Sequence, residues 1–140
     1  MFFSADDGNN GSELWKSDGT AAGTVLVKDI NPGVAASDPA ALADFGGTLF
    51  VQANDGTDGM ELWTSDGTSA GTVLIKDIDA GGDSFPDLMT PFEGELYFSA
   101  FDQADGRELW KTDGTGDGTT LAADINPGWR RLDPIRIHRT

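Results

Sequence analysis

The stretch Glu61-Leu62-Trp63-Thr64-Ser65-Asp66-Gly67-Thr68 has two close copies in this 140-residue sequence, at 13–20 and 108–115. The copies are 48 and 47 residues apart. In the middle copy a Gly-Thr pair follows at 71–72 and an Asp-Ile pair at 77–78, and both pairs recur at matching places in the other copies. Because the similarity covers almost the whole chain, we interpret it as one structural unit repeated three times.

Each repeat reads as four short strands separated by turns. The strands expected in the middle copy are 40–45, 48–53, 60–65 and 72–77. The turn-forming pairs Gly46-Gly47 and Asp66-Gly67 fall between them. Four strands joined by short turns, at a period of roughly 40 to 50 residues, are typical of a β-propeller blade. The sequence therefore predicts an all-β fold, a β-propeller made of four-stranded antiparallel blades.

The repeats predict a single repeat domain over 1–140 with three blades per chain. The expected limits are 1–30 for blade 1, 39–78 for blade 2 and 86–125 for blade 3. The first copy begins at its second strand, because 1–5 aligns with 49–53, so its own first strand is missing. A spare first strand is expected in the 133–140 segment, where 133–138 aligns with 38–43.

These two ends predict self-association. Three blades are too few for a ring, since propellers have about four to eight. Two chains would make six blades, and the C-terminal strand of each chain would complete the first blade of its partner in a homodimer. The alternatives are a larger ring or an open array.

The aromatic residues of the repeat are expected to fill the space between blades. One blade cannot bury both of its faces alone, so it must stack on its neighbours. The residues expected there are Trp15, Trp63, Trp110, Phe3, Phe50 and Phe98. We favour this core role over a sugar-stacking role for the tryptophans.

The composition limits the classes of partner. Acidic residues outnumber basic ones 24 to 9, for a net charge of −15. Nucleic acid and anionic membrane surfaces are therefore disfavoured, because both require clustered Lys and Arg. No apolar run reaches the roughly 18 to 20 residues of a membrane span, so no membrane insertion is expected. Cations, neutral sugars and basic proteins are compatible partners.

The pattern Glu-Leu-Trp-x-x-Asp-Gly-Thr, followed by Gly-Thr and Asp-Ile, resembles the bacterial ELWxxDGT repeat family. The resemblance implies propeller-like repeats in secreted or cell-surface proteins, and it implies no particular reaction. The start of this chain has no signal-peptide pattern. The third copy departs from the motif, with Ala122-Ala123 where the others have Val27-Lys28 and Ile75-Lys76. The tail 129–140 carries four of the nine basic residues.

Acidic loops before the third strand of each repeat are candidate Ca²⁺ sites. Oxygen ligands recur there at three and six residues' spacing, with a glycine between, which could wrap a cation. The candidate ligands are Asp7, Asn10 and Glu13; Asp55, Asp58 and Glu61; and Asp102, Asp105 and Glu108. The alternative is a glycine-containing turn in which the glutamate is solvated or bound to backbone amides. No organic cofactor is expected.

The Asp-Gly-Thr turns are interpreted as structural. Asp18, Asp66 and Asp113 can each accept a hydrogen bond from a backbone amide two residues on, which is an ordinary Asx turn.

Catalytic candidates are few. The sequence has no cysteine and one histidine, His138, so a repeated Ser-His-Asp arrangement or a zinc site is excluded. A pair of carboxylates, as glycosidases use, remains possible. The non-repeated residues that could meet in a propeller channel are Asp44, Asp87, Glu93, Arg136 and His138.

Three functions remain open from the sequence. The first is a binding or adhesion module for a glycan, calcium or a protein partner, because repeated loops offer multivalent weak sites. The second is a glycoside hydrolase that uses a carboxylate pair in the channel. The third is a purely structural repeat in a surface protein.

Overall fold

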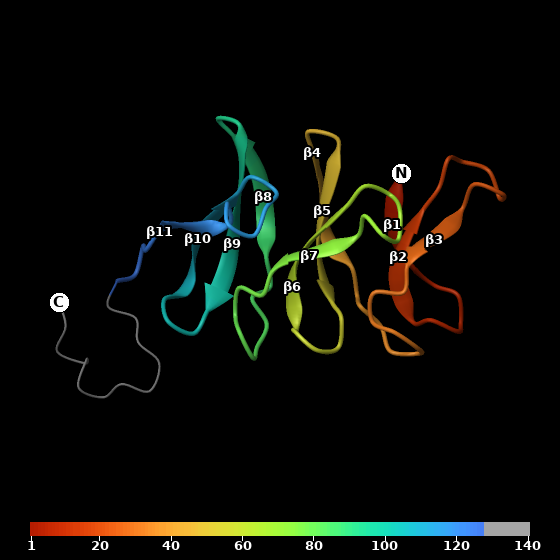
Figure 1. The fold of residues 1–140 in the computed structure, drawn as a ribbon, viewed down its shortest axis with the longest axis horizontal. Coiled ribbons are helices and arrows are strands. Elements are labelled where there is room, and N and C mark those ends of the chain that lie inside the picture. Colours follow the sequence, from red (N-terminus) through yellow and green to blue (C-terminus); the bar gives the residue numbers. More distant parts are fainter. Residues whose placement is uncertain (128–140) are drawn as a thin grey trace.

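The computed structural model describes residues 1–127, which form only strands, turns and loops. The expected strand at 133–140, together with Arg136 and His138, lies outside the described residues. Three separate antiparallel sheets stand in a row (Figure 1). None of the three sheets is closed into a barrel. The described residues include no helix that could cross a membrane.

Each sheet follows the chain order of its strands. The first sheet contains β1 (Phe2–Asp6), β2 (Ser12–Lys16) and β3 (Val25–Lys28). The second contains β4 (Ala40–Phe45), β5 (Thr48–Asn54), β6 (Met60–Ser65) and β7 (Val73–Lys76). The third contains β8 (Asp87–Phe92), β9 (Glu95–Asp102), β10 (Gly106–Thr112) and β11 (Thr120–Ala123).

The strands of the middle repeat agree closely with the expected ones. β4 and β6 have the expected limits, and β5 is one residue longer. β7 is shorter by one residue at each end. Thr72 is drawn out of the strand by the preceding turn, where its backbone N–H donates to Ser69 O at 3.3 Å and its hydroxyl donates to Thr68 O at 2.7 Å.

The first sheet has three strands, as its sequence predicts. β1 pairs with β2 on one side and is the outer strand of the sheet. In the other two sheets this outer position belongs to β4 and β8.

A β-bulge recurs in the last strand pair of every sheet. In the second sheet Leu62 pairs with Lys76 and Trp63 pairs with Leu74, so Ile75 is the extra residue. The matching shifts occur at Leu14/Trp15 and Leu109/Trp110. A bulge changes the direction of the side chains that follow it. Here Leu74 packs on one side of the sheet and Ile75 on the other.

The two faces of the middle sheet each pack against a neighbouring sheet. We call the face that carries Leu62 the forward face, the face that carries Trp63 the rear face, and we use both names for the matching positions of every sheet. The forward positions are Phe2, Leu14, Val27 and Ile30; Phe50, Leu62, Ile75 and Ile78; and Tyr97, Leu109, Ala122 and Ile125. The rear positions are Met1, Phe3, Ala5, Trp15 and Leu26; Leu49, Val51, Ala53, Trp63 and Leu74; and Leu96, Phe98, Ala100, Trp110 and Leu121.

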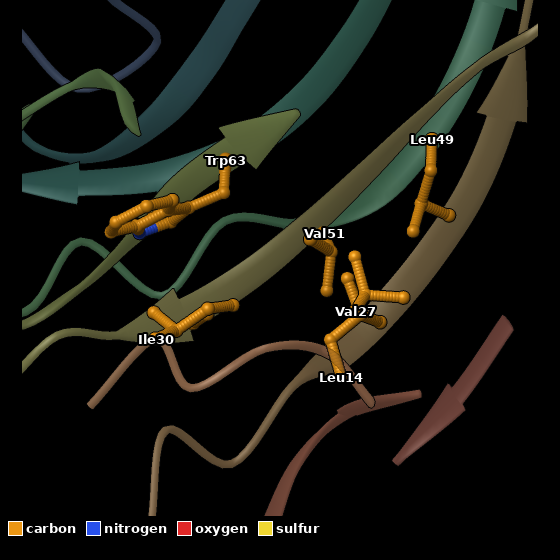
Figure 2. Close-up of a cluster of buried hydrophobic side chains, with 7 residues drawn as sticks. Leu14, Val27, Ile30, Leu49, Val51 and Trp63 are labelled. Carbon is orange, nitrogen blue, oxygen red and sulfur yellow. The ribbon is translucent and has the colours of Figure 1, made fainter. Parts of the chain in front are cut away.

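Each internal interface joins a forward face to a rear face. In the first, shown in Figure 2, Leu14, Val27 and Ile30 point toward Leu49, Val51 and Trp63. In the second, the forward positions of the second sheet meet the rear positions of the third. The core role is confirmed for Trp63 and Trp110, which are each 6% exposed. Phe3, Phe50 and Phe98 were expected at equivalent positions, but they lie on two different faces. Phe50 is at the forward position that Phe2 has in the first sheet, whereas Phe98 is at the rear position of Phe3.

Lysine side chains also cross between sheets. Lys28 Nζ donates to Thr72 O and Lys76 Nζ donates to Thr119 O, each at 3.1 Å. Both lysines hold the last strand of one sheet against the Gly-Thr turn of the next. The third repeat has Ala123 at this position.

Candidate functional site

The repeated glutamate before each Leu-Trp pair fastens the sheet to the segment that leaves it. The carboxylate of Glu61 accepts hydrogen bonds from the backbone N–H groups of Ile78 and Asp79 at 2.9 and 3.1 Å. It also accepts one from the hydroxyl of Ser84, in the linker to the third sheet. Glu61 is fully buried. In the structure this glutamate is bound to backbone amides of the departing segment.

Glu13 makes the same contacts one repeat earlier. It accepts from the backbone of Ile30 and Asn31, and from both the backbone and the hydroxyl of Ser37. Burial raises the pKa of both carboxyl groups, although these hydrogen bonds oppose the rise. The pKa of Glu61 reaches about 7.

The linker serines also connect neighbouring sheets through their backbones. Ser37 N–H donates to Ser12 O at 3.0 Å, while Ser37 O accepts from Asn54 N–H at 2.9 Å. Ser84 links Met60 and Phe101 in the same way. The third glutamate, Glu108, accepts from Ile125 and Asn126. In the sequence the position that matches the two serines is Leu132, which has no hydroxyl group.

The aspartates of the candidate Ca²⁺ loops bind the backbone of their own turns. Asp7 accepts from the N–H groups of Asn9 and Asn10, which lowers the pKa of its carboxyl group. The side chain of Asn10 also donates to Asp7 at 2.7 Å. Asp102 accepts from the N–H of Asp105 at 2.6 Å.

In the middle loop, Asp55 accepts from Thr57 and Asp58 N–H at 2.8 Å each. The pKa of Asp58 is raised by a hydrogen bond with the Asp55 carboxylate and by the negative charge of that carboxylate. Within residues 1–127, no group of three acidic or histidine side chains is arranged to hold a metal ion. Ca²⁺ binding by these loops stays a prediction.

The Asp-Gly-Thr segments form the expected Asx turns in all three repeats. Asp66 Oδ1 accepts from the N–H of Thr68 at 2.9 Å and from its hydroxyl at 2.6 Å. These bonds lower the pKa of Asp66, and matching bonds do so for Asp18 and Asp113. A Cβ atom at Gly71 would overlap the Asp66 carboxylate. The turn therefore explains the repeated glycine, for which the sequence suggested no role.

A recess lies between the second and third sheets, beside the linker that joins them. Its volume is about 490 Å³. It is lined by Asp79, Gly81, Gly82, Asp83, Phe85, Phe101, Gln103 and Arg107. Asp83 also lines a smaller polar recess of about 310 Å³, together with the loop between β5 and β6. The same linker therefore contributes to two hollows of the surface.

Arg107 and Asp83 fix one wall of the larger recess. The guanidinium of Arg107 donates to Phe85 O at 3.3 Å and to the hydroxyl of Ser99 at 2.7 Å. Asp83 Oδ1 accepts from Met60 N–H at 2.7 Å. Phe85 is 47% exposed, and its φ is +45°, a region that non-glycine residues rarely adopt.

The residues of the recess differ from the matching residues of the first junction. Phe85 replaces Asp38, which has a similar φ of +49°, and Arg107 replaces Met60. At the first junction Asn31 packs against Gly56 instead. This site is not apparent from the repeated motif, because its residues differ between the copies. The signal that could have found it is the change from aspartate to an exposed aromatic residue at one linker.

The catalytic candidates within the described residues are exposed and dispersed. Asp44 is the second-last residue of β4 and Glu93 lies in the turn after β8, so both are near the same end of their sheets. Asp87 begins β8 and is at the other end. The carboxylate pair of a glycosidase stays a prediction.

The fold defines an all-β protein of three stacked antiparallel sheets, in which the residues at one junction differ from those at the other. Comparison with protein-family models, curated proteins and solved structures found no match for the chain.

Proposed function

We propose that this chain is a propeller-type binding module of a secreted or cell-surface bacterial protein of the ELWxxDGT repeat kind, and that it binds a neutral glycan at the recess beside Phe85. The observation that supports this most directly is the exposed aromatic side chain in a hollow that also contains carboxylate and amide groups. Binding sites combine apolar surface with a few convergent polar groups in this way.

The chemistry of the recess matches a sugar ring. The apolar face of Phe85 can pack against the C–H groups of a pyranose, which makes an aromatic ring suitable for this contact. The exposed side chains of Asp83 and Gln103 supply acceptors and donors for hydroxyl groups. Because the chain carries a net charge of −15, a neutral glycan is favoured over an acidic one.

The blades of this module are the three sheets. Two chains would form a six-bladed ring in which the C-terminal strand of each chain completes the partner's first blade. Support for this comes from the three-stranded first sheet and from forward-to-rear stacking at both internal interfaces. The ring would then carry two copies of the recess, one from each chain. Two sites on one particle strengthen binding to a multivalent glycan.

The test is binding of the 140-residue chain to a panel of neutral oligosaccharides, measured by calorimetry. We expect Phe85→Asn to weaken binding at least tenfold, because it removes the aromatic surface but tolerates a positive φ. The matched control is Asp38→Asn, at the same position of the first junction, and it should leave binding unchanged. Absence of binding to every neutral glycan, or equal loss in both variants, would refute the proposal.

A further inference from the structure

Within residues 1–127, each of the two outermost sheets has a face that is less buried than the matching faces inside the molecule. The rear face of the first sheet includes Phe3 and Trp15, which pair across β1 and β2 and are half-buried. The matching residues Val51 and Trp63 are 0% and 6% exposed. The forward face of the third sheet includes Leu109, half-buried, whereas the matching Leu14 and Leu62 are fully buried.

The forward face of the third sheet carries the same kind of aromatic pair as the buried forward face of the second sheet. In the second sheet Phe45 and Phe50 meet edge to face, with ring centroids 6.1 Å apart, and both belong to the interface with the third sheet. Phe92 and Tyr97 occupy the same two positions in the third sheet and meet edge to face at 5.7 Å. Phe92 is 57% exposed.

An apolar hollow lies beside this aromatic pair. Its volume is about 430 Å³, and its lining includes Leu88, Phe92, Tyr97 and Leu109. Leu88 is 73% exposed. Exposed apolar surface of this kind, next to strands whose equivalents are buried, indicates an interface.

We propose that the forward face of the third sheet binds the rear face of the first sheet of a second copy of this chain. The contact would place Phe3, Trp15 and Leu26 where Phe98, Trp110 and Leu121 pack in the second internal interface. The argument for this occupant is continuity: both internal interfaces join these same two faces at these same positions. The inference rests on the propeller-type stacking proposed above and specifies its surfaces.

One contact of the internal interfaces is absent from the free face. Lys28 and Lys76 each donate to a carbonyl oxygen of the following sheet, and Ala123 is the matching residue of the third sheet. Thr24 is the residue of the first sheet that matches the acceptors Thr72 and Thr119. Copies are therefore expected to associate more weakly than the sheets within one chain, and a lysine at 123 is expected to strengthen the association.

The first experiment measures the mass of the whole chain by sedimentation over a range of concentrations. We expect the 14.7 kDa chain to form dimers or larger assemblies. Phe3→Asp places a charge in the rear face of the first sheet, and Leu109→Glu places one in the forward face of the third sheet. Each variant alone should remain monomeric. Mixing the two variants should give a one-to-one heterodimer through the two intact faces.

Several results would overturn the proposal. These are a wild-type chain that stays monomeric at every concentration, a Phe3→Asp variant that still self-associates, or a mixture that forms no heterodimer. Circular dichroism and a thermal melt show that the variants are folded, which is expected because both positions are only half-buried.

A gain of affinity tests the register of the contact. Ala123→Lys should tighten self-association on the order of tenfold, as a charged hydrogen bond does. Ala104→Lys adds the same charge in the exposed loop after β9 and should have a much smaller effect. Equal effects of the two lysines would refute the register. Glycan binding is measured separately with Phe85→Asn, so failure of the docking and failure of the binding function are distinguished.

Discussion

The glycine before each repeated threonine illustrates how a single residue determines the local structure. Gly23, Gly71 and Gly118 have ordinary φ values, so backbone conformation does not require glycine there. Each is required because the carboxylate of the preceding turn occupies the space that a Cβ atom would need. The same carboxylate accepts two hydrogen bonds from the threonine of its Asp-Gly-Thr motif.

Replacing Gly71 with alanine should therefore destabilise the protein through Asp66. The new methyl group displaces the carboxylate and breaks its bonds to Thr68, so the variant should be less stable than the wild type. The measurement is the free energy of unfolding in urea for Gly71→Ala, Asp66→Ala and the double variant. The effects should be strongly non-additive, since Asp66→Ala removes the overlap. Additive effects would contradict the explanation.

The raised pKa values of Glu13 and Glu61 make stability depend on pH. The pKa of Glu61 is about 7 in the folded protein and 4.5 for an unperturbed glutamate, so between these values the folded state binds more protons than the unfolded state. Its contribution to stability is fully present below pH 4.5 and is lost as pH rises toward 7. Asp18, Asp66 and Asp113 act in the opposite direction, but only at lower pH, because their pKa values are lowered.

We therefore expect the stability of the wild-type chain to fall more steeply from pH 5 to pH 7 than that of Glu61→Gln. The variant should also be less stable by about 1–3 kcal/mol, because an amide NH₂ cannot accept the hydrogen bond of a backbone N–H. Urea unfolding at a series of pH values measures both effects. Parallel pH profiles for the two proteins would argue against a raised pKa at Glu61.

At the scale of the strand, identical residues at equivalent positions of two sheets can differ in how deeply they are buried. Leu62 and Leu109 have the same place in the bulged strand pair of their sheets. The forward face of the second sheet is covered by the third sheet, while that of the third is open. Leu62 is therefore expected to contribute more than Leu109 to the stability of a single chain.

Leu62→Ala should cost about 2–5 kcal/mol, the usual range for a cavity in a packed core. Leu109→Ala should cost less than about 1 kcal/mol when measured on dilute, monomeric protein, since little packing is lost. Thermal or urea unfolding of both variants checks this matched pair. Similar losses would mean that Leu109 is covered even in the monomer.

At the scale of the whole molecule, stability follows the linear order of the sheets. Only neighbouring sheets form the two hydrophobic clusters, as in repeat proteins whose stability is a sum over units and interfaces. The second sheet lies between the other two (Figure 1). Within residues 1–127 it packs on both faces, whereas the first and third sheets each pack on one.

Amide hydrogen exchange of the monomer should therefore be slowest in β5 and β6. Exchange in β1 and β2, and in β9 and β10, should be faster because these strands can open without breaking both interfaces. Raising the concentration should slow exchange in the two outer sheets if the end faces dock as proposed. Uniform protection in dilute protein would contradict a linear array.

The sequence alone determined the repeat and most of its strands. Glycine and aspartate mark the turns, and the local bonding of Asp66 to Thr68 needs only residues two positions apart, so the Asx turns followed directly from the motif. The limits of β4 and β6 followed for the same reason, and those of β5 and β7 to within one residue, because they depend on local alternation and turn residues. The three-stranded first sheet followed from the alignment of its first residues with the other copies.

Only the tertiary structure decided what contacts form between repeats. The glutamate of each motif binds amides 17 and 18 residues away. Glu13 and Glu61 also bind a serine more than 20 residues away, and no local pattern encodes such distances. The bulge that turns Ile75 to the opposite face from Leu74 is likewise invisible in the sequence. The recess depends on Phe85, Gln103 and Arg107 meeting across a junction of two sheets. Their assembly is set by packing of distant segments, which the repeat pattern does not specify.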